Sequence, residues 1–302
     1  MTTINFDASI DDDSRRRRLF DGELFVYSPR AASLAMCALA REMASSAFAP
    51  RDPRTAQHEM PVEQFAAVLA DLKPRFIHHP RCKELLQDLL IDLGCDPDQT
   101  YFDVPRLRTS TSDDFLSSGI SYAFHPHRDT WYSAPACQVN FWFPVYDVTP
   151  DNVMALHLPY WNRALRNGSR DYNYAEWNRV SRKAAAQQIG KDTRKQPRPE
   201  EEVELDPQLR IVMPVGSLLL FSAAHLHSTV PNTSGTTRFS IDFRTVHIAD
   251  VEQRRGAPNV DSECTGTSMG DYLRIRDLAH IPAALISAYD TPPLAPATQQ
   301  SR

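Results

Sequence analysis

Apolar residues in the first third of the chain recur at the spacing of one face of a helix. The pattern covers 31–46, 62–72 and 81–93, and Gly94 follows the last stretch. Glycine favours the left-handed conformation that closes many helices. Residues 1–99 are therefore predicted to form a mostly helical support layer.

Two segments near the N-terminus depart from this pattern. In 19–27, LFDGELFVY, short apolar runs flank Asp21 and Gly22. An Asp-Gly pair favours the tight turn that joins two antiparallel strands, so this segment is predicted to be a β-hairpin. The charged run 11–18 is predicted to be a solvated surface whose acids and arginines pair with one another.

From about residue 100 onward, short runs rich in β-branched and aromatic residues replace the helical pattern. They predict successive antiparallel strands. The runs lie at 100–110, 120–127, 136–148, 152–161, 209–230 and 236–248. In one of them Gln138, Asn140 and Trp142 alternate with apolar residues, which predicts a strand with one polar face in a small barrel that holds a ligand.

The segment 161–207 interrupts the strands with polar, helix-capable sequence and is predicted to be a lid. Between 161 and 198 it carries ten Lys or Arg against three Asp or Glu. This excess, which includes Arg163, Arg166 and Arg170, either attracts an anionic substrate or is a solvated helix surface. The tail at 291–302 is predicted to be disordered.

Composition narrows the class of protein. The 302 residues are 42% apolar and 24% charged, as in soluble globular proteins, and are predicted to form a single domain. The net charge of −5 offers no basic surface for nucleic acid. Five scattered cysteines, the absence of a long apolar run and an N-terminus unlike a signal peptide predict a cytoplasmic protein without membrane spans that acts on a small molecule. The oligomeric state stays open, a homodimer included.

A candidate metal site begins in FHPHRDTWY, residues 124–132, where His127 and Asp129 form a His-x-Asp pair. Residues two apart on a strand share a face, so both side chains are expected in one pocket. The pair is the local half of a two-histidine, one-carboxylate site, which binds iron and leaves other positions open. A third ligand is expected on a later strand, where His225 and His227 lie.

The run after these histidines passes through a turn to Arg238 and Ser240. Together with the His-x-Asp pair, this order of residues resembles the iron(II)/2-oxoglutarate-dependent dioxygenases, most closely the phytanoyl-CoA dioxygenase-like branch. In that branch an arginine follows the ligand histidine by eleven positions, and Arg238 lies eleven positions after His227. The resemblance covers roughly residues 100–248 and selects His227 over His225.

The resemblance implies a mainly β fold with α-helices, a double-stranded β-helix of the jelly-roll or cupin type flanked by the N-terminal helices. It implies Fe(II) held by His127, Asp129 and His227, with 2-oxoglutarate and O2 as cosubstrates. Arg238 and Ser240 would grip the distal carboxylate of 2-oxoglutarate, because a planar guanidinium matches a carboxylate with two parallel hydrogen bonds.

The implied reaction hydroxylates an unactivated carbon of a small molecule, an amino acid or a specialised-metabolite intermediate, while 2-oxoglutarate is decarboxylated to succinate. Desaturation, ring closure and epimerisation share its first step and stay open. Halogenating relatives replace the carboxylate ligand with a small residue, so Asp129 argues against halogenation.

Six further residues have two interpretations each. Gln138 and Asn140 either contact the cosubstrate or tie strands together. His125 and His225 face the substrate or are ordinary core or surface histidines, and Trp131 and Tyr132 line the substrate pocket or pack beneath it.

Two other functions are compatible with the same residues. The metal triad can serve a lyase or hydrolase in which a divalent ion acts as a Lewis acid. A non-catalytic binding barrel can retain the pocket for recognition. The Arg238 and Ser240 pair disfavours the first and the complete triad disfavours the second.

Overall fold

The computed structural model describes residues 2–117, 119–121, 124–180 and 187–290. The tail expected to be disordered, 291–302, lies outside the described residues, as does 181–186 within the expected lid. No helix among the described residues is both long and apolar enough to cross a membrane.

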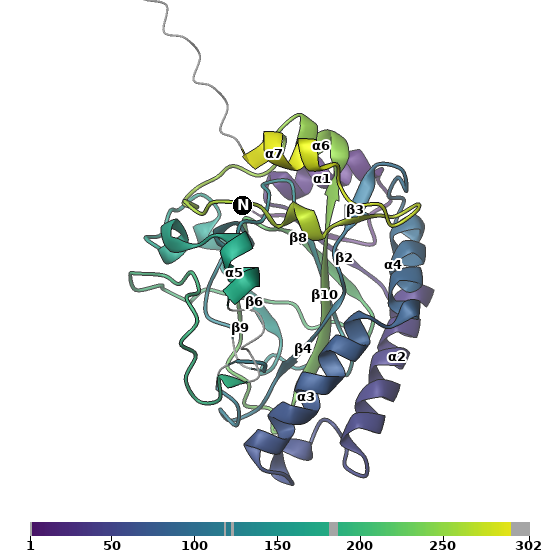
Figure 1. Ribbon diagram of the computed structural model, residues 1–302, viewed down its shortest axis with the longest axis vertical. Coiled ribbons are helices and arrows are strands. Elements are labelled where there is room, and N and C mark those ends of the chain that lie inside the picture. Colours follow the sequence, from purple (N-terminus) through teal and green to yellow (C-terminus); the bar gives the residue numbers. More distant parts are fainter. Residues whose placement is uncertain (1, 118, 122–123, 181–186, 291–302) are drawn as a thin grey trace, which may run out of the picture.

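The helices expected at 31–46, 62–72 and 81–93 are present as α2, α3 and α4, and they gather on one side of the molecule (Figure 1). The helices of the described residues are α1 Asp12–Phe20, α2 Ala31–Phe48, α3 Val62–Ile77, α4 Pro80–Asp92, α5 Tyr174–Val180, α6 Ile248–Glu252 and α7 Ala283–Asp290. Single 3₁₀ turns lie at Ala56–His58, Asp129–Tyr132, Leu158–Tyr160, Gly168–Asp171 and Ser268–Asp271.

The hairpin expected at 19–27 is wrong in its first half, because Leu19 and Phe20 end α1. Asp11 caps this helix by accepting a hydrogen bond from the Ser14 N–H at 2.8 Å. Acidic residues in the first turn and arginines in the last suit the helix dipole, so the charge order favours a helix over a strand. The turn itself is present, with Gly22 at φ +89°.

The charged run 11–18 is self-paired as expected, but it is not wholly solvated. Arg15 and Arg16 are 3% and 7% exposed. Both pair with Asp12, and Arg16 also reaches Asp250 at 2.6 Å. The buried side of α1 therefore attaches the N-terminus to the α6 region through ion pairs.

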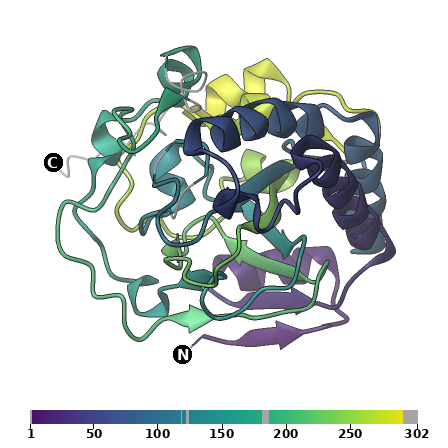
Figure 2. The same ribbon diagram turned by 90° about the horizontal axis from the view of Figure 1, so that it is seen from below.

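The strands form two sheets. The larger has the order β1-β2-β8-β5-β10-β3-β11 with β4 also on β10, and the smaller has the order β7-β6-β9. Figure 2 shows the N-terminal strands, in purple, at one edge of the molecule. The strands of the described residues are β1 Ile4–Phe6, β2 Leu24–Tyr27, β3 Thr100–Phe102, β4 Arg106–Ser110, β5 Val139–Pro144, β6 Met154–Leu156, β7 Leu209–Arg210, β8 Leu218–Ser222, β9 His227–Thr229, β10 Arg238–His247 and β11 Leu273–Arg274.

The expectation of a closed barrel needs correction. Among the described strands, no hydrogen-bonded ladder joins the two sheets, so the sheets are not closed. They are linked by connecting segments, and an isolated bridge joins His127, which lies outside both sheets, to His227 of β9. The likeness to a jelly-roll lies in two facing sheets with a core between them.

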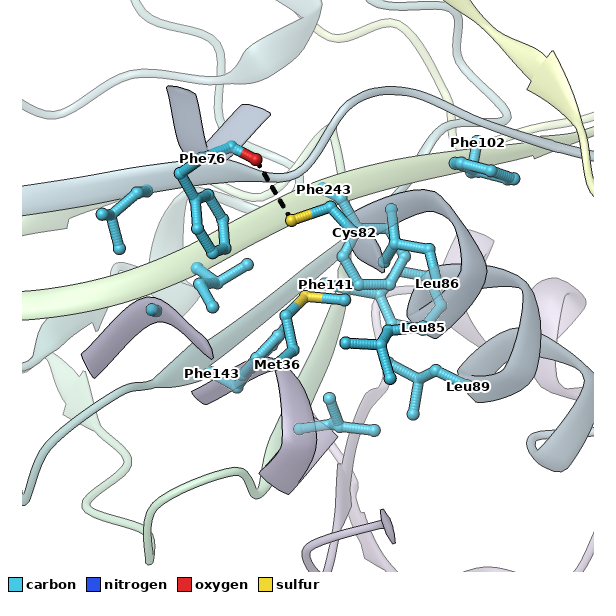
Figure 3. Packing of buried hydrophobic residues seen from close by; sticks show 14 of the residues in the cluster. Met36, Phe76, Cys82, Leu85, Leu86, Leu89, Phe102, Phe141, Phe143 and Phe243 are labelled. Carbon is cyan, nitrogen blue, oxygen red and sulfur yellow. Dashed lines mark hydrogen bonds between the residues drawn. The ribbon is translucent and has the colours of Figure 1, made fainter. Parts of the chain in front are cut away.

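Two apolar clusters hold the fold together. In one, the outer face of the larger sheet packs on α2, α3 and α4, where Phe141, Phe143 and Phe243 meet Met36 and Leu86 (Figure 3). The other lies between the two sheets. It combines residues of β2, β5 and β8 with residues of β6 and of the turns beside them.

The predicted alternation along β5 is confirmed by these clusters. Phe141 and Phe143 point to the helices, whereas Asn140 and Trp142 line a cavity between the sheets. Period-2 alternation puts these two sets on opposite faces of one strand. The polar face of β5 therefore looks into the space where a ligand can bind.

Candidate metal centre and anion site

A two-way backbone bridge brings the two halves of the candidate metal site together. The N–H of His127 donates to the carbonyl of His227, and the N–H of His227 donates to the carbonyl of His127, each at 2.9 Å. The described part of 120–127 is not a regular strand as expected. It forms this isolated bridge, and the Phe124 carbonyl accepts one further hydrogen bond from the Thr229 N–H at 3.0 Å. Asp129 begins the 3₁₀ turn Asp129–Tyr132, and its carboxylate lies beside both imidazoles.

His127, Asp129 and His227 offer ligand atoms that all lie within 4.8 Å of one another. The Asp129 Oδ1 atom is 3.6 Å from Nε2 of His127 and 3.8 Å from Nε2 of His227. Each ring directs Nδ1 at a backbone carbonyl, that of His125 at 2.8 Å and that of His225 at 3.0 Å. A carbonyl only accepts hydrogen bonds, so each Nδ1 carries the proton and each Nε2 lone pair is available to a metal.

The protonation states of this cluster suit a divalent cation. Burial, helped by the nearby charge of His127, lowers the pKa of His227 to about 4. Burial alone would raise the pKa of Asp129, but hydrogen bonds and charge from His127 and His227 outweigh it and lower that pKa to about 2. At neutral pH the site therefore presents a neutral imidazole of His227 and an ionised carboxylate, as metal ligation requires.

Gln138 supports the carboxylate ligand instead of lining the cavity. Its Nε2 donates to Asp129 Oδ2 at 3.2 Å and to Asn140 Oδ1 at 2.8 Å. Its Oε1 accepts from the hydroxyl of Tyr272 at 2.7 Å. The cosubstrate role expected for Gln138 is therefore replaced by orientation of Asp129, while Asn140 does line the cavity. Nothing in the sequence near Tyr272 pointed to this contact.

The metal cluster opens into a cavity between the sheets that encloses about 580 Å³, its mouth included. The lining residues are Arg108, Phe124, His127, Asp129, Asn140, Phe141, Trp142, Met154, Phe221, His227, Ser228, Thr229, Arg238, Asp242, Phe243 and Arg244.

Arg238 is a buried cation without a counterion. It is 6% exposed, and Nη1 donates to the Asn152 carbonyl at 3.1 Å, while Nε has no hydrogen-bond partner. Among the described residues, no carboxylate forms an ion pair with it, and burial lowers its pKa to about 10. The hydroxyls of Ser240 and of Ser110, which lies opposite Arg238 on β4, are also buried without partners. Arg238 lines the cavity and the two serines lie on the same face of the sheet beside it, so these unsatisfied groups are arranged to receive an anion.

Trp131 and His225 do not line this cavity, so their expected substrate roles are corrected. Trp131 is fully buried and donates from Nε1 to Asp261 at 2.7 Å. His225 is 2% exposed, contacts the Gly22 carbonyl at 3.2 Å and stacks on Trp161. Trp131 lies within the 3₁₀ turn Asp129–Tyr132 and His225 directly follows a turn at 223–224, so the two-residue alternation of a strand does not apply to either residue.

His125 and Tyr132 lie beside the metal centre but contact the segment 161–207. His125 Nε2 and the Tyr132 hydroxyl both reach the Pro197 carbonyl, at 2.9 and 3.0 Å. The Tyr132 ring also packs edge-on against His127, with 5.5 Å between centroids. The described part of the segment near Pro197 thus touches the surroundings of the metal site, and closure over the site stays a prediction.

The arginines of that segment are less available to an anion than their number indicated. Arg170 pairs with Glu200 at 2.6 Å, and Arg166 lies 3.9 Å from Glu201. Arg163 stacks on the ring of a neighbouring tyrosine. The acids that neutralise the run come just after residue 198, outside the window in which the excess was counted.

Three charged residues of the cavity were missed by the sequence analysis: Arg108, Asp242 and Arg244. The last two continue the inward alternation of Arg238 and Ser240 along β10, so extending that pattern by four residues would have found them. Arg108 was hidden because only strand pairing places β4 beside β10.

Comparisons with known proteins give the following. No family model matches the sequence, and no curated protein matches it. The branch suggested by resemblance therefore stays a prediction.

The chain is similar in structure to several solved enzymes. One is EvdO2 from Micromonospora carbonacea var. aurantiaca, with a TM-score of 0.46, 11% identity, and coverage of 80% of this chain and 93% of that chain. Another is the non-heme alpha ketoglutarate dependent epimerase SnoN from nogalamycin biosynthesis. Its TM-score is 0.35 and its sequence identity 14%, with coverage of 78% of this chain and 84% of that chain. A third is the non-heme monooxygenase ThoJ, with a TM-score of 0.37, 14% sequence identity, and coverage of 74% of this chain and 74% of that chain. Similarities this low do not decide the chemistry of this chain, so its function is inferred from the site.

Proposed function

We propose that this protein is an iron(II)/2-oxoglutarate-dependent oxygenase that acts on a small molecule. The observation that carries the proposal is one cavity with a facial set of two imidazoles and a carboxylate near a buried guanidinium that lacks a counterion. When bound, iron and 2-oxoglutarate supply oxidation of an unactivated C–H bond, coupled to loss of carbon dioxide from the cosubstrate.

The residues present fit these groups. His127, Asp129 and His227 form a three-ligand set that leaves other positions of a metal free. Arg238 can donate two parallel hydrogen bonds to a carboxylate, and Ser240 and Ser110 can add donors from β10 and β4. Asn140 presents an amide near the metal ligands without adding charge.

The charge of the cavity also favours a dianionic cosubstrate. Its lining holds three guanidiniums, Arg108, Arg238 and Arg244, against two carboxylates, Asp129 and Asp242. A divalent metal ion would enlarge this positive excess, and a dicarboxylate would reduce it. A lyase or hydrolase would use the same arginine only with an anionic substrate.

Asp129 and the lining of the cavity support a finer proposal for the reaction outcome. Because the carboxylate ligand is present, we propose hydroxylation in preference to halogenation. The apolar lining from Phe221, Met154 and Trp142 suits the body of a small molecule and would exclude water from the reacting carbon.

The test is anaerobic addition of Fe(II) and then 2-oxoglutarate to metal-free protein, followed by visible spectroscopy. Chelated 2-oxoglutarate gives such iron a weak charge-transfer band, which we expect for the wild type and for the control Arg166→Ala, whose side chain is 76% exposed. Arg238→Ala is expected to need at least about 30-fold more 2-oxoglutarate, since a charge-assisted bidentate contact contributes roughly 2 kcal/mol or more.

Two results would contradict the proposal. If iron binds to His127, Asp129 and His227 but no band appears at any 2-oxoglutarate concentration, the metal serves other chemistry, and a lyase or hydrolase becomes the better hypothesis. If Arg238→Ala binds 2-oxoglutarate as the wild type does, the anion site has been assigned to the wrong residue.

A further inference from the structure

A second cation lies at the open side of the cavity. Arg108 on β4 is opposite Ser240 on β10, so its side chain shares the inward face with the proposed cosubstrate residues. Its side chain is 32% exposed, whereas Arg238 is 6% exposed. The two guanidiniums thus mark an outer and an inner end of one cavity.

Arg108 is only partly neutralised. Its Nε donates to Asp242 Oδ1 at 2.7 Å, and its Nη2 contacts Oδ2 at 3.4 Å. Asp242 also receives Arg244 at 3.0 Å, so one carboxylate serves two guanidiniums. The Nη1 of Arg108 makes no hydrogen bond within the described residues. A guanidinium has five N–H donors, so Arg108 can stay on Asp242 and still bind another carboxylate.

A ring contact connects Arg108 to the metal centre. Its guanidinium carbon lies 5.4 Å from the centroid of the Phe124 ring. The same ring lies 5.8 Å from the ring of His127. The contact with Phe124 restricts the arginine, whose side chain is still 32% exposed. An anion bound by Arg108 would be held beside the metal centre.

We propose that Arg108 binds a carboxylate of the substrate, which makes the substrate class small carboxylic acids with an apolar body. This inference rests on the proposed function, because it assigns the inner cation, Arg238, to 2-oxoglutarate. The acid enters at the outer cation, and its body lies on Phe124, Phe221 and Met154. Arg163, Arg166 and Arg170 of the segment 161–207 have no part in this contact.

The experiment uses the full chain loaded anaerobically with Fe(II) and 2-oxoglutarate. A panel of small aliphatic and aromatic carboxylic acids is titrated, each beside its primary amide, which has the same shape without the charge. The readout is a shift of the visible charge-transfer band. The variants are Arg108→Gln, Arg108→Lys and the exposed control Arg166→Gln, and thermal unfolding reports whether each is folded.

We expect several acids, but not their amides, to shift the band. Arg108→Gln should weaken acid binding at least about tenfold and change the affinity for 2-oxoglutarate less than about threefold, because only the outer contact is lost. Arg108→Lys should retain part of the acid affinity, since it keeps the charge without the planar fork. Arg166→Gln should behave as the wild type.

Several outcomes would overturn the assignment. The first is a panel in which amides bind as well as acids, or in which no acid shifts the band. The second is acids that act only by displacing 2-oxoglutarate, seen as loss of the band. The third is an Arg108→Gln variant that loses 2-oxoglutarate instead, which would make Arg108 a cosubstrate residue. The acid-against-amide comparison in the wild type holds even if a variant does not fold. Absence of any band with 2-oxoglutarate alone would instead contradict the proposed function.

Discussion

Two buried arginines near the candidate metal centre differ in whether their charge is paired. Arg128, between the ligands His127 and Asp129, is 1% exposed; its Nε pairs with Asp261 at 3.1 Å, and its Nη atoms donate to backbone carbonyls. Arg238 is nearly as buried but has one carbonyl, an unpaired Nε and no carboxylate.

The difference separates a structural charge from one that is available to a ligand. A buried charge is tolerated when hydrogen bonds and a counterion replace water, as around Arg128. Asp261 also accepts from Trp131 and from the Leu165 N–H, so this cluster connects the metal motif to two distant segments. Around Arg238 the replacement is only partial. The Asn152 carbonyl accepts one hydrogen bond, the guanidinium carbon lies 5.9 Å from the centroid of the Trp142 ring, and Asp242 acts on it without forming an ion pair, so a bound anion would compensate the remaining desolvation.

The largest effect on the free energy of unfolding is expected from substitution of Arg128, the paired arginine. Arg128→Met leaves the Asp261 carboxylate, 3% exposed, without its guanidinium. We expect the free energy of unfolding to fall by about 3–5 kcal/mol, as when one partner of a buried pair is removed. Urea denaturation measures it, with Arg166→Met as an exposed control expected within about 0.5 kcal/mol of the wild type. A loss under about 1 kcal/mol would remove the distinction between the two arginines.

Substituting Arg238 by methionine should change the free energy of unfolding in the opposite direction, and this change should depend on whether 2-oxoglutarate is bound. Arg238→Met removes an unpaired buried charge, so the unliganded protein should be unchanged or more stable, within about 1 kcal/mol. At 100 times its dissociation constant, 2-oxoglutarate with Fe(II) should stabilise the wild type by about 2.7 kcal/mol. Fe(II) alone should stabilise both proteins. The comparison would fail if 2-oxoglutarate added equal stability to the variant.

A smaller effect, on metal affinity, is expected from Gln138, which hydrogen-bonds the Asp129 carboxylate. Gln138→Leu removes the donor to Asp129 and leaves the Tyr272 hydroxyl without its acceptor. Loss of such an outer contact commonly weakens metal binding 10- to 100-fold, and we expect the lower end, about 10-fold. Isothermal titration with Fe(II) or Co(II) tests this. Unaltered metal affinity would mean that Gln138 only ties strands together.

A pH-dependent effect concerns a third cation near these arginines, the half-buried Lys73, which can lose its proton as an arginine cannot. Burial, with the charges of Arg108 and Arg238, lowers its pKa to about 7. In the unfolded chain a lysine keeps its proton to about pH 10.4. Between these values the unfolded state binds more protons, so the contribution of Lys73 to stability rises with pH. Urea denaturation at pH 7, 8 and 9 should show this rise in the wild type relative to Lys73→Met. A constant difference would mean that Lys73 stays charged.

Much of the arrangement was predictable from local patterns. The helical spacing at 31–46, 62–72 and 81–93 and the alternation along β5 depend only on neighbours in sequence, and both occur in the structure. Local reasoning failed where a neighbouring element changed the geometry. The first strand of the hairpin expected at 19–27 is absent because a capped, dipole-matched helix extends to Phe20, while the turn and the second strand are present.

The sequence by itself determined which residue types are available for the site: the His-x-Asp pair, the later histidine at His227, and an arginine with a serine two residues on. Only the tertiary structure decided how they are used. The backbone bridge between His127 and His227, the transfer of Gln138 to Asp129 and the place of Arg108 beside β10 are all contacts between segments far apart in the chain. Such contacts depend on strand register and packing, which no local pattern encodes. Whether a buried arginine is paired, as Arg128 is, or left open, as Arg238 is, follows from that packing alone.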